Sequence, residues 1–154
     1  MGPITTFFWG LLLVAIDQLI KWYVLLCKPR ISSFAFACAP TLNRGMALSI
    51  GASGMYYYAS LLPFAIVAVY LLLIVLVIRL RLWQEAPYAY MLIAAGGFSN
   101  LLDRLQHGGV VDFIALLPDA FQLPIFNIAD MYIVFGVLWI IGTMMRAENN
   151  AKAV

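Results

Sequence analysis

Two aspartates stand in apolar stretches of this sequence, where an ionised carboxylate is costly to bury. Asp112 follows two valines and precedes Phe113 and Ile114 in "GGVVDFI", and Asp130 ends "FNIAD", at the start of an apolar run that continues to Met145. A carboxyl group among apolar neighbours keeps its proton to a higher pH than usual unless it is paired. If the two carboxyl groups lie together, the ionised one can take a proton from water while the protonated one polarises a carbonyl.

This is the chemistry of an aspartic protease, which needs neither a metal nor a nucleophilic side chain. No cluster of His, Cys and acidic residues in the sequence has metal-ligand spacing, so we expect neither a metal nor a cofactor. A local alternative exists for Asp130: Asn127 is a residue type that caps helices, and an acid in the first helical turn interacts favourably with the helix dipole. That alternative accounts for Asp130 and leaves Asp112 unexplained.

The composition predicts the kind of elements that must position these residues. The chain has 154 residues, of which 65% are hydrophobic and 10% charged, whereas soluble domains are roughly half apolar and a quarter charged. One short chain cannot hide so many apolar side chains in a single core, so the sequence predicts an integral membrane protein. The net charge of +2 is too small to favour a nucleic-acid partner.

Four apolar runs approach the length of about 20 residues that a membrane-spanning helix needs. We therefore expect an all-α membrane protein with four transmembrane helices, forming a single integral membrane domain over residues 1–154. The predicted spans are residues 7–27, 58–78, 86–105 and 128–145.

Basic residues predict the orientation of these spans. The linker between the second and third spans and the C-terminal tail carry four of them, Arg79, Arg81, Arg146 and Lys152. Because Lys and Arg accumulate in the cytoplasmic loops of membrane proteins, we expect a multi-pass protein with both termini in the cytoplasm. The longer loops 28–57 and 106–127 then lie outside, and apolar, partly alternating segments in the first loop predict a small extracytoplasmic β-containing region.

This topology also brings the two aspartates together. The third span ends at the outer face and the fourth begins there. The 18 residues from Asp112 to Asp130 are enough to return the chain beside itself. The two carboxyl groups are therefore expected to meet at the outer membrane surface.

Two further charges lie inside the first predicted span. Asp17 and Lys21 are four residues apart, on one helix face, with the acid before the base in the favourable order. Charged groups in spanning segments are rare and by default mark function. Two interpretations stay open: a pair that neutralises itself, or a pair that braces polar groups on neighbouring helices or contacts a ligand.

The motif "GGFSNLLDR" ends the third predicted span. Gly96 and Gly97 allow a neighbouring helix to approach closely. Asn100 and Arg104 share a helix face, and Asp103 lies near it. The structural alternative is a helix end anchored at the membrane surface by Arg104, with Asp103 as its ion-pair partner, and we expect that role for Asp103.

Five motifs together resemble the lipoprotein signal peptidases (signal peptidase II), which are aspartic proteases of the bacterial plasma membrane. The resemblance covers the whole chain and all four predicted spans. The motifs, in the order and membrane positions of that family, are "DQLIK" (17–21), "NRGMA" (43–47), "GGFSNLLDR" (96–104), "VVDF" (110–113) and "FNIAD" (126–130).

The resemblance implies a catalytic pair, Asp112 and Asp130. It implies that the substrate is a prolipoprotein whose cysteine already carries diacylglycerol, cleaved just before that cysteine. Membrane lipids and cyclic peptide inhibitors of the globomycin type are the other partners that it implies. The substrate-binding or supporting residues that it implies are Asp17, Lys21, Asn43, Gly45, Gly96, Asn100, Arg104 and Asn127.

The sequence departs from the family pattern at two places. Phe98 and Ser99 stand where the family usually has small residues, and Leu48-Ser49 stand where it usually has Phe-Gly. These changes spare every charged position. They bear on the details of substrate binding more than on the reaction.

Two other functions fit parts of the sequence. A serine intramembrane protease would use Ser53 of "GASG" as nucleophile and His107, the only histidine, as base. A small transporter or channel subunit would use the charged residues in the spans as an ion pathway, although no inverted repeat is visible. Cys27 and Cys38 could be free thiols or a disulfide.

Overall fold

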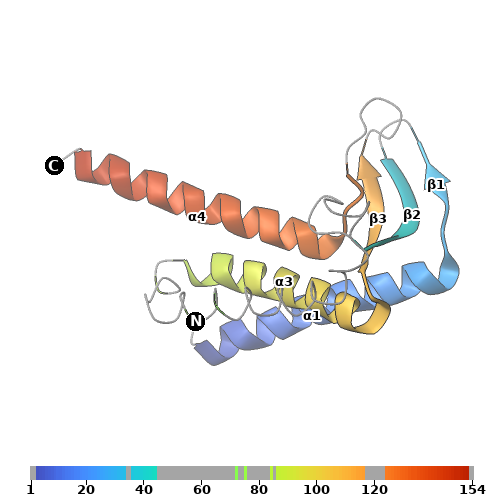
Figure 1. Cartoon of the computed structure of the whole chain (residues 1–154). Helices are drawn as coiled ribbons and strands as arrows, with labels where there is room; N and C mark the ends of the chain where they lie inside the picture. Colours follow the sequence, from blue (N-terminus) through green and yellow to red (C-terminus); the bar gives the residue numbers. More distant parts are fainter. Residues whose placement is uncertain are drawn as a thin grey trace.

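The computed structural model describes residues 3–33, 36–44, 72, 75, 84, 86–116 and 124–152. Long helices lie alongside one another, and a small sheet stands at one end of them (Figure 1). The start of α1 and the end of α4 both lie toward the opposite end. The elements in chain order are α1 (Pro3–Cys27), β1 (Ile31–Ser32), β2 (Phe36–Asn43), α3 (Pro87–His107), β3 (Val110–Leu116) and α4 (Ile128–Lys152).

Helices occur where the first, third and fourth spans were predicted. Two of the described helices are long and apolar enough to cross a membrane, over Ile4–Cys27 and Ile128–Ala147. α3 has a similar length of 21 residues, but it is less apolar. The predicted span 58–78 lies outside the described residues apart from Leu72 and Val75.

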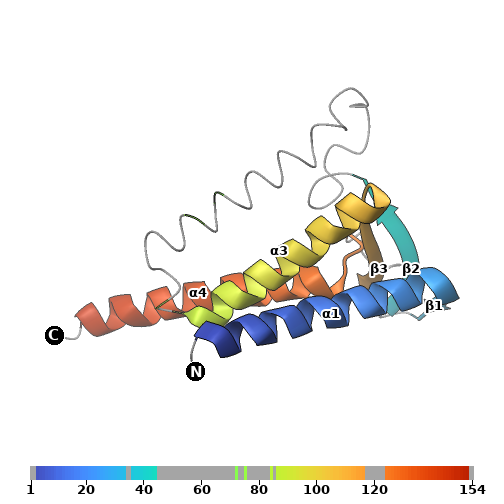
Figure 2. The same ribbon diagram turned by 90° about the horizontal axis from the view of Figure 1, so that it is seen from below.

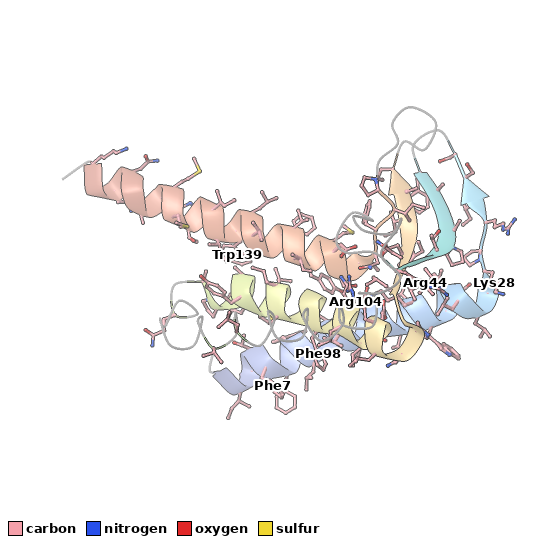
Figure 3. All side chains as sticks on the ribbon, viewed as in Figure 1. Phe7, Lys28, Arg44, Phe98, Arg104 and Trp139 are labelled. Carbon is pink, nitrogen blue, oxygen red and sulfur yellow. The ribbon has the colours of Figure 1, made fainter. Side chains whose placement is uncertain are left out.

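The outward faces of α1 and α4 carry large apolar side chains. Phe7, Leu19 and Trp22 on α1 and Leu138 on α4 are each more than half exposed, and Phe7 projects away from the other helices (Figure 3). Large exposed apolar surfaces of this kind are rare on soluble monomers and suit a lipid environment.

α3 packs between α1 and α4 (Figure 2). Glycine makes the contact with α4 close. A Cβ added at Gly96 would meet the Ala129 carbonyl oxygen, and one at Gly136 would lie 2.7 Å from the Ala89 carbonyl oxygen. The close helix approach predicted at Gly96 is therefore confirmed. This contact restricts the position of α4 along the axis of α3.

The sheet has the order β1-β2-β3 and is antiparallel throughout. β2 pairs with β3 from Phe36 opposite Leu116 to Asn43 opposite Val110, with an irregularity between Cys38 and Thr41. Sheet structure was predicted in the first loop, where β1 and β2 lie. The rest of that loop, residues 45–57, lies outside the described residues.

No strand was predicted within the second loop, residues 106–127, where Val110–Leu116 form β3. The first four residues of this strand are all buried. A strand buried on both faces lacks the alternation of apolar and polar residues that marks a half-buried one, so the period-2 signal was absent. The chain is therefore mostly helical with a small sheet built from both loops.

A small apolar cluster attaches the sheet to α1. It contains Val24, Cys38 and Phe113, with Ile20 and Ile128 packed against it. Cys38 is a buried free thiol within this cluster, and Cys27 at the end of α1 is an exposed free thiol. Of the two interpretations left open for the cysteines, the structure therefore has the free thiols.

Candidate active site

A short antiparallel bridge returns the chain beside β3 before α4 begins. The backbone nitrogens of Phe113 and Ile114 donate to the Phe126 carbonyl oxygen at 3.0 and 2.9 Å, and the Phe126 nitrogen donates to the Ile114 oxygen at 2.9 Å. Asp112 lies just before this bridge and Asp130 shortly after it. Asp112 therefore belongs to β3 and Asp130 to the first turn of α4, and the start of α4 lies next to β3 (Figure 1).

Asp112 is almost fully buried, at 3% exposed. Its Oδ1 accepts a hydrogen bond from the Asn127 side-chain amide at 2.7 Å, and its Oδ2 accepts one from the Asn43 amide at 3.0 Å. Burial raises the pKa of Asp112 to about 6, and the nearby charge of Asp130 also raises it, against the lowering effects of the two amides and of Lys21. This carboxyl group therefore keeps a proton to a much higher pH than an ordinary aspartate.

Asp130 takes part in a reciprocal cap at the start of α4. Its backbone nitrogen donates to Asn127 Oδ1 at 3.0 Å, while its Oδ2 accepts from the Asn127 backbone nitrogen at 3.2 Å. The helix cap predicted from sequence is confirmed. Its Oδ1 has a different partner, the Asn100 side-chain amide at 2.8 Å, so the carboxylate also faces the rest of the site.

Two asparagine amides connect the carboxylates. The Asn127 side-chain nitrogen donates both to Asp112 and, at 3.1 Å, to Asn100 Oδ1. Asn100 Oδ1 also accepts from the Lys21 ammonium at 3.0 Å, and its own nitrogen donates to Asp130. One continuous network therefore joins Asp112, Asp130 and a buried cation.

Lys21 lies at the centre of a buried ionic cluster. Its Nζ is 2.8 Å from Asp17 Oδ2 and 2.8 Å from Asp103 Oδ2, and the three side chains are between 0 and 2% exposed. Asp17 also accepts from the Ser99 hydroxyl at 2.6 Å and from the Ala129 backbone nitrogen at 3.0 Å. Asp17 and Lys21 thus pair with each other and also brace α3 and α4.

The role expected for Asp103, as an ion-pair partner of Arg104 at the membrane surface, is wrong. Asp103 is fully buried. It contacts Lys21, accepts from Gln18 Nε2 at 2.7 Å and accepts from the Val111 backbone nitrogen at 3.0 Å. The neighbouring position in sequence suggested Arg104 as partner, whereas the helix turns the two side chains in different directions.

Arg104 is half-buried and lies between α3 and the start of α4 (Figure 3). Its Nη1 donates to the Asn100 carbonyl oxygen at 3.2 Å. Its charge is close enough to Asp112 and Asp130 to interact with both. A partly exposed cation beside two carboxyl groups is therefore available to a substrate.

Sequence reasoning missed two residues of this site, Gln18 and Ser99. Gln18 donates to the Ser99 carbonyl oxygen, the Ser99 hydroxyl and Asp103, at 3.1, 3.0 and 2.7 Å. Both lie inside the quoted motifs, and their signal was an uncharged polar residue facing inward within an apolar span. In the described part of the chain, every buried side-chain nitrogen and oxygen has a hydrogen-bond partner.

The other residues that the sequence predicted for the site lie partly at the aspartates and partly elsewhere. Asn43, Asn100, Arg104 and Asn127 gather around the aspartates, and Gly96 lies where α3 meets α4. His107 is exposed at the end of α3. Gly45 and Ser53 lie outside the described residues.

Known proteins share this sequence and fold. The family described as Signal peptidase (SPase) II matches residues 10–146. A lipoprotein signal peptidase of Chlamydia muridarum is 31% identical over 97% of this chain and 96% of its own, and one of Streptococcus thermophilus is 31% identical over 92% of each. A solved bacterial membrane enzyme aligns with a TM-score of 0.73 at 26% identity, covering 96% of this chain and 92% of the enzyme. This chain therefore belongs to the signal peptidase II family and is a membrane-bound bacterial protease.

Proposed function

We propose that this protein removes the signal peptide from diacylglyceryl-modified prolipoproteins, cleaving before the lipidated cysteine by an aspartic mechanism. The relatives' name, lipoprotein signal peptidase, supports the substrate class. The observation that carries the mechanism is the single hydrogen-bond network that includes both Asp112 and Asp130. Among the described residues, no other two carboxyl groups lie one on a β-strand and one at the start of a helix, with a half-buried arginine beside both.

The two carboxyl groups have different surroundings, which suits them to different roles. Asp130 lies in the first turn of α4, where its carboxylate accepts hydrogen bonds from the Asn100 side-chain amide and the Asn127 backbone nitrogen. Asp112 is more deeply buried, so its protonated form is favoured. We assign Asp130 as the base that activates water and Asp112 as the acid that protonates the scissile carbonyl.

The reaction balances with these two groups alone. Asp130 takes a proton from water as the water oxygen bonds to the carbonyl carbon, and Asp112 gives its proton to the carbonyl oxygen. Asp130 then gives its proton to the leaving nitrogen as the carbon–nitrogen bond breaks. The hydroxyl formed on the carbonyl oxygen returns a proton to Asp112, which restores the starting state.

The arrangement of the helices supports an active site at the outer membrane face. The start of α1 and the end of α4 lie away from the sheet (Figure 1). The two residues of the dyad, Asp112 and Asp130, belong to β3 and to the first turn of α4. With both termini in the cytoplasm, the sheet and the dyad face the opposite side of the inner membrane. Lipids and globomycin-type cyclic peptides would approach the dyad from that side.

Asparagine substitutions test the mechanism. Asn keeps the shape of Asp and can still accept a hydrogen bond at α4, but it cannot act as a base or hold the shared proton. Loss of the helix-dipole interaction costs only about 0.3–1 kcal/mol, whereas loss of an acid–base group costs about 100- to 10,000-fold in rate. Asp112→Asn and Asp130→Asn should each fold, insert and fail to cleave a diacylglyceryl prolipoprotein.

The double variant should be scarcely worse than either single one, because the two residues act as a unit. Asp119→Asn is the control, since Asp119 lies between the two aspartates in sequence but outside every motif. It should cleave normally. The opposite outcome is that Asp130→Asn keeps about a third or more of normal turnover, which is a far smaller loss than removal of an acid–base group causes. In that case Asp130 would be a helix cap and the mechanism would be wrong.

A further inference from the structure

Two buried carboxylates hold the backbone at equivalent places in the two segments that carry the dyad. Asp103 Oδ2 accepts from the backbone nitrogen of Val111, the residue immediately before Asp112, at 3.0 Å. Asp17 Oδ1 accepts from the backbone nitrogen of Ala129, the residue immediately before Asp130, at 3.0 Å. The same relation therefore occurs on both sides of the dyad, once on β3 and once on α4.

The Lys21 ammonium joins the two carboxylates. It lies 2.8 Å from an oxygen of Asp17 and 2.8 Å from an oxygen of Asp103. Its third partner is Asn100 Oδ1, at 3.0 Å, and the Asn100 amide donates to Asp130. Buried, charge-assisted contacts of this length are short and directional, so they restrict movement of the groups that they join.

We propose that Asp17 and Asp103 are paired positioning residues, each holding the backbone just before one aspartate of the dyad, with Lys21 fixing the distance between them. Asp17, Lys21 and Asp103 together are called the clamp below. This inference rests on the proposed function, because it assigns a role relative to the Asp112–Asp130 pair. The three residues act through backbone geometry and do not touch the reacting atoms.

The local connections of the dyad leave this role unfilled. The bridge at Phe126 links β3 to the segment before α4, and the Asn127 cap fixes the first turn of α4. Neither contact connects the dyad to α1. The apolar cluster at Val24 joins α1 to Phe113 and Ile128, but its contacts have no fixed direction. The contacts around Lys21 add directional hydrogen bonds and ion pairs from α1, so the position of α1 bears on the spacing of the two aspartates. Productive geometry in an active site tolerates roughly 0.5 Å of displacement.

The test measures kinetics of Asp103→Asn and Asp17→Asn, each of which keeps the side-chain shape while removing the charge that holds Lys21. A displacement of about 1 Å at reacting groups costs up to about 100-fold in rate. We expect kcat to fall by roughly 10-fold or more in each variant, with KM within about twofold of wild type, because the substrate-binding surface is unchanged.

The pH profile gives a second measurement that a role in stability alone would not move. Burial is the main cause of the raised pKa of Asp112, and the charge of Asp130 adds to it. The effect of Asp130 weakens as the two groups separate. Removing the charge of Asp17 or Asp103 also leaves Lys21, which lowers the pKa of Asp112, less neutralised. The pH shift therefore reports the spacing of the dyad only in Gln18→Met, which keeps every charge beside Lys21. In that variant the pKa of Asp112 should fall and the basic limb of kcat/KM should move to lower pH. Thr143→Ala is the control and should match wild type, because it removes a hydroxyl that donates to the Ile140 carbonyl oxygen at 2.7 Å, within α4 itself and beyond the residues of the site.

Gln18→Met keeps the test decisive if the charge-removing variants fail to insert. It leaves Asp17, Lys21 and Asp103 in place. It removes the contact from Gln18 to Asp103 at 2.7 Å and the contacts to the Ser99 carbonyl and hydroxyl oxygens at 3.1 and 3.0 Å. We expect a fall in kcat of about threefold, in line with the loss of uncharged hydrogen-bond donation, together with a shift of the basic limb to lower pH. Unchanged kcat per folded enzyme in whichever of these variants folds, together with an unchanged basic limb in Gln18→Met, would overturn the clamp.

Failure of the clamp and failure of the proposed function are distinguishable. If Asp112→Asn and Asp130→Asn abolish cleavage while Asp103→Asn has wild-type kinetics, the dyad stands and the clamp is wrong. If Asp130→Asn cleaves normally, the mechanism itself is wrong, whatever Asp103→Asn does. Complete loss of activity from a well-folded Asp17→Asn protein would give Asp17 a direct catalytic role and also contradict the clamp.

Discussion

Replacing Lys21 by Met should destabilise the protein strongly, because it removes the cation between two buried carboxylates. Met has a similar length and no charge, so the change leaves little cavity. Three contacts are lost, to Asp17, Asp103 and Asn100, at 2.8, 2.8 and 3.0 Å. Removing one partner of a buried ion pair typically costs about 3–5 kcal/mol.

The structure decides where in that range the cost should fall. Two carboxylates lose their cation together, which increases the cost. Each keeps two other donors: Ser99 and the Ala129 nitrogen for Asp17, and Gln18 and the Val111 nitrogen for Asp103. These opposing effects place the expected loss in the free energy of unfolding at about 4 kcal/mol. For a chain of this length, that corresponds to a fall in Tm of roughly 8–16 °C.

The assay is reversible unfolding in mixed micelles, with Tm recorded in parallel. A second substitution provides the sharpest check. Asp103→Asn in the Lys21→Met background removes one of the two unpaired charges, so the double variant should be more stable than Lys21→Met alone. Unfolding of Lys21→Met within about 1 kcal/mol of wild type, well below the usual cost, would refute the reasoning. So would a double variant that is less stable than the single one.

Three further predictions concern the dyad, the helix contact and the topology. Asn43→Ala removes a donor that lowers the pKa of Asp112, so the basic limb of kcat/KM should move to higher pH. Gly96→Ala should cost about 1–3 kcal/mol on unfolding, because the added Cβ would meet α4, whereas Gly142→Ala meets nothing within 4 Å and should be neutral. A phosphatase reporter active only outside the cytoplasm should be dark at the C-terminus and bright within 106–125, and the reverse would overturn the orientation.

The sequence alone determined the helices that the structure describes and the residue types at the site. A spanning helix needs about 20 apolar residues in succession, which is a local property, so α1, α3 and α4 were predicted at nearly their observed positions. The cap of Asn127 with Asp130 was also predictable, because both partners lie within one helical turn. The strand that carries Asp112 was not, because burial on both faces removed its alternation.

Only the tertiary structure decided how the polar residues are connected. The Asp17 carboxylate binds the Ala129 nitrogen across 112 residues, and Gln18 binds Asp103 across 85. Sequence spacing placed Asp103 beside Arg104, while the packing of α3 against α1 turned it toward Lys21. Such contacts depend on the relative position and rotation of whole helices. Close contacts at glycines such as Gly96 determine how α3 and α4 pack together. No local pattern of residues contains that information.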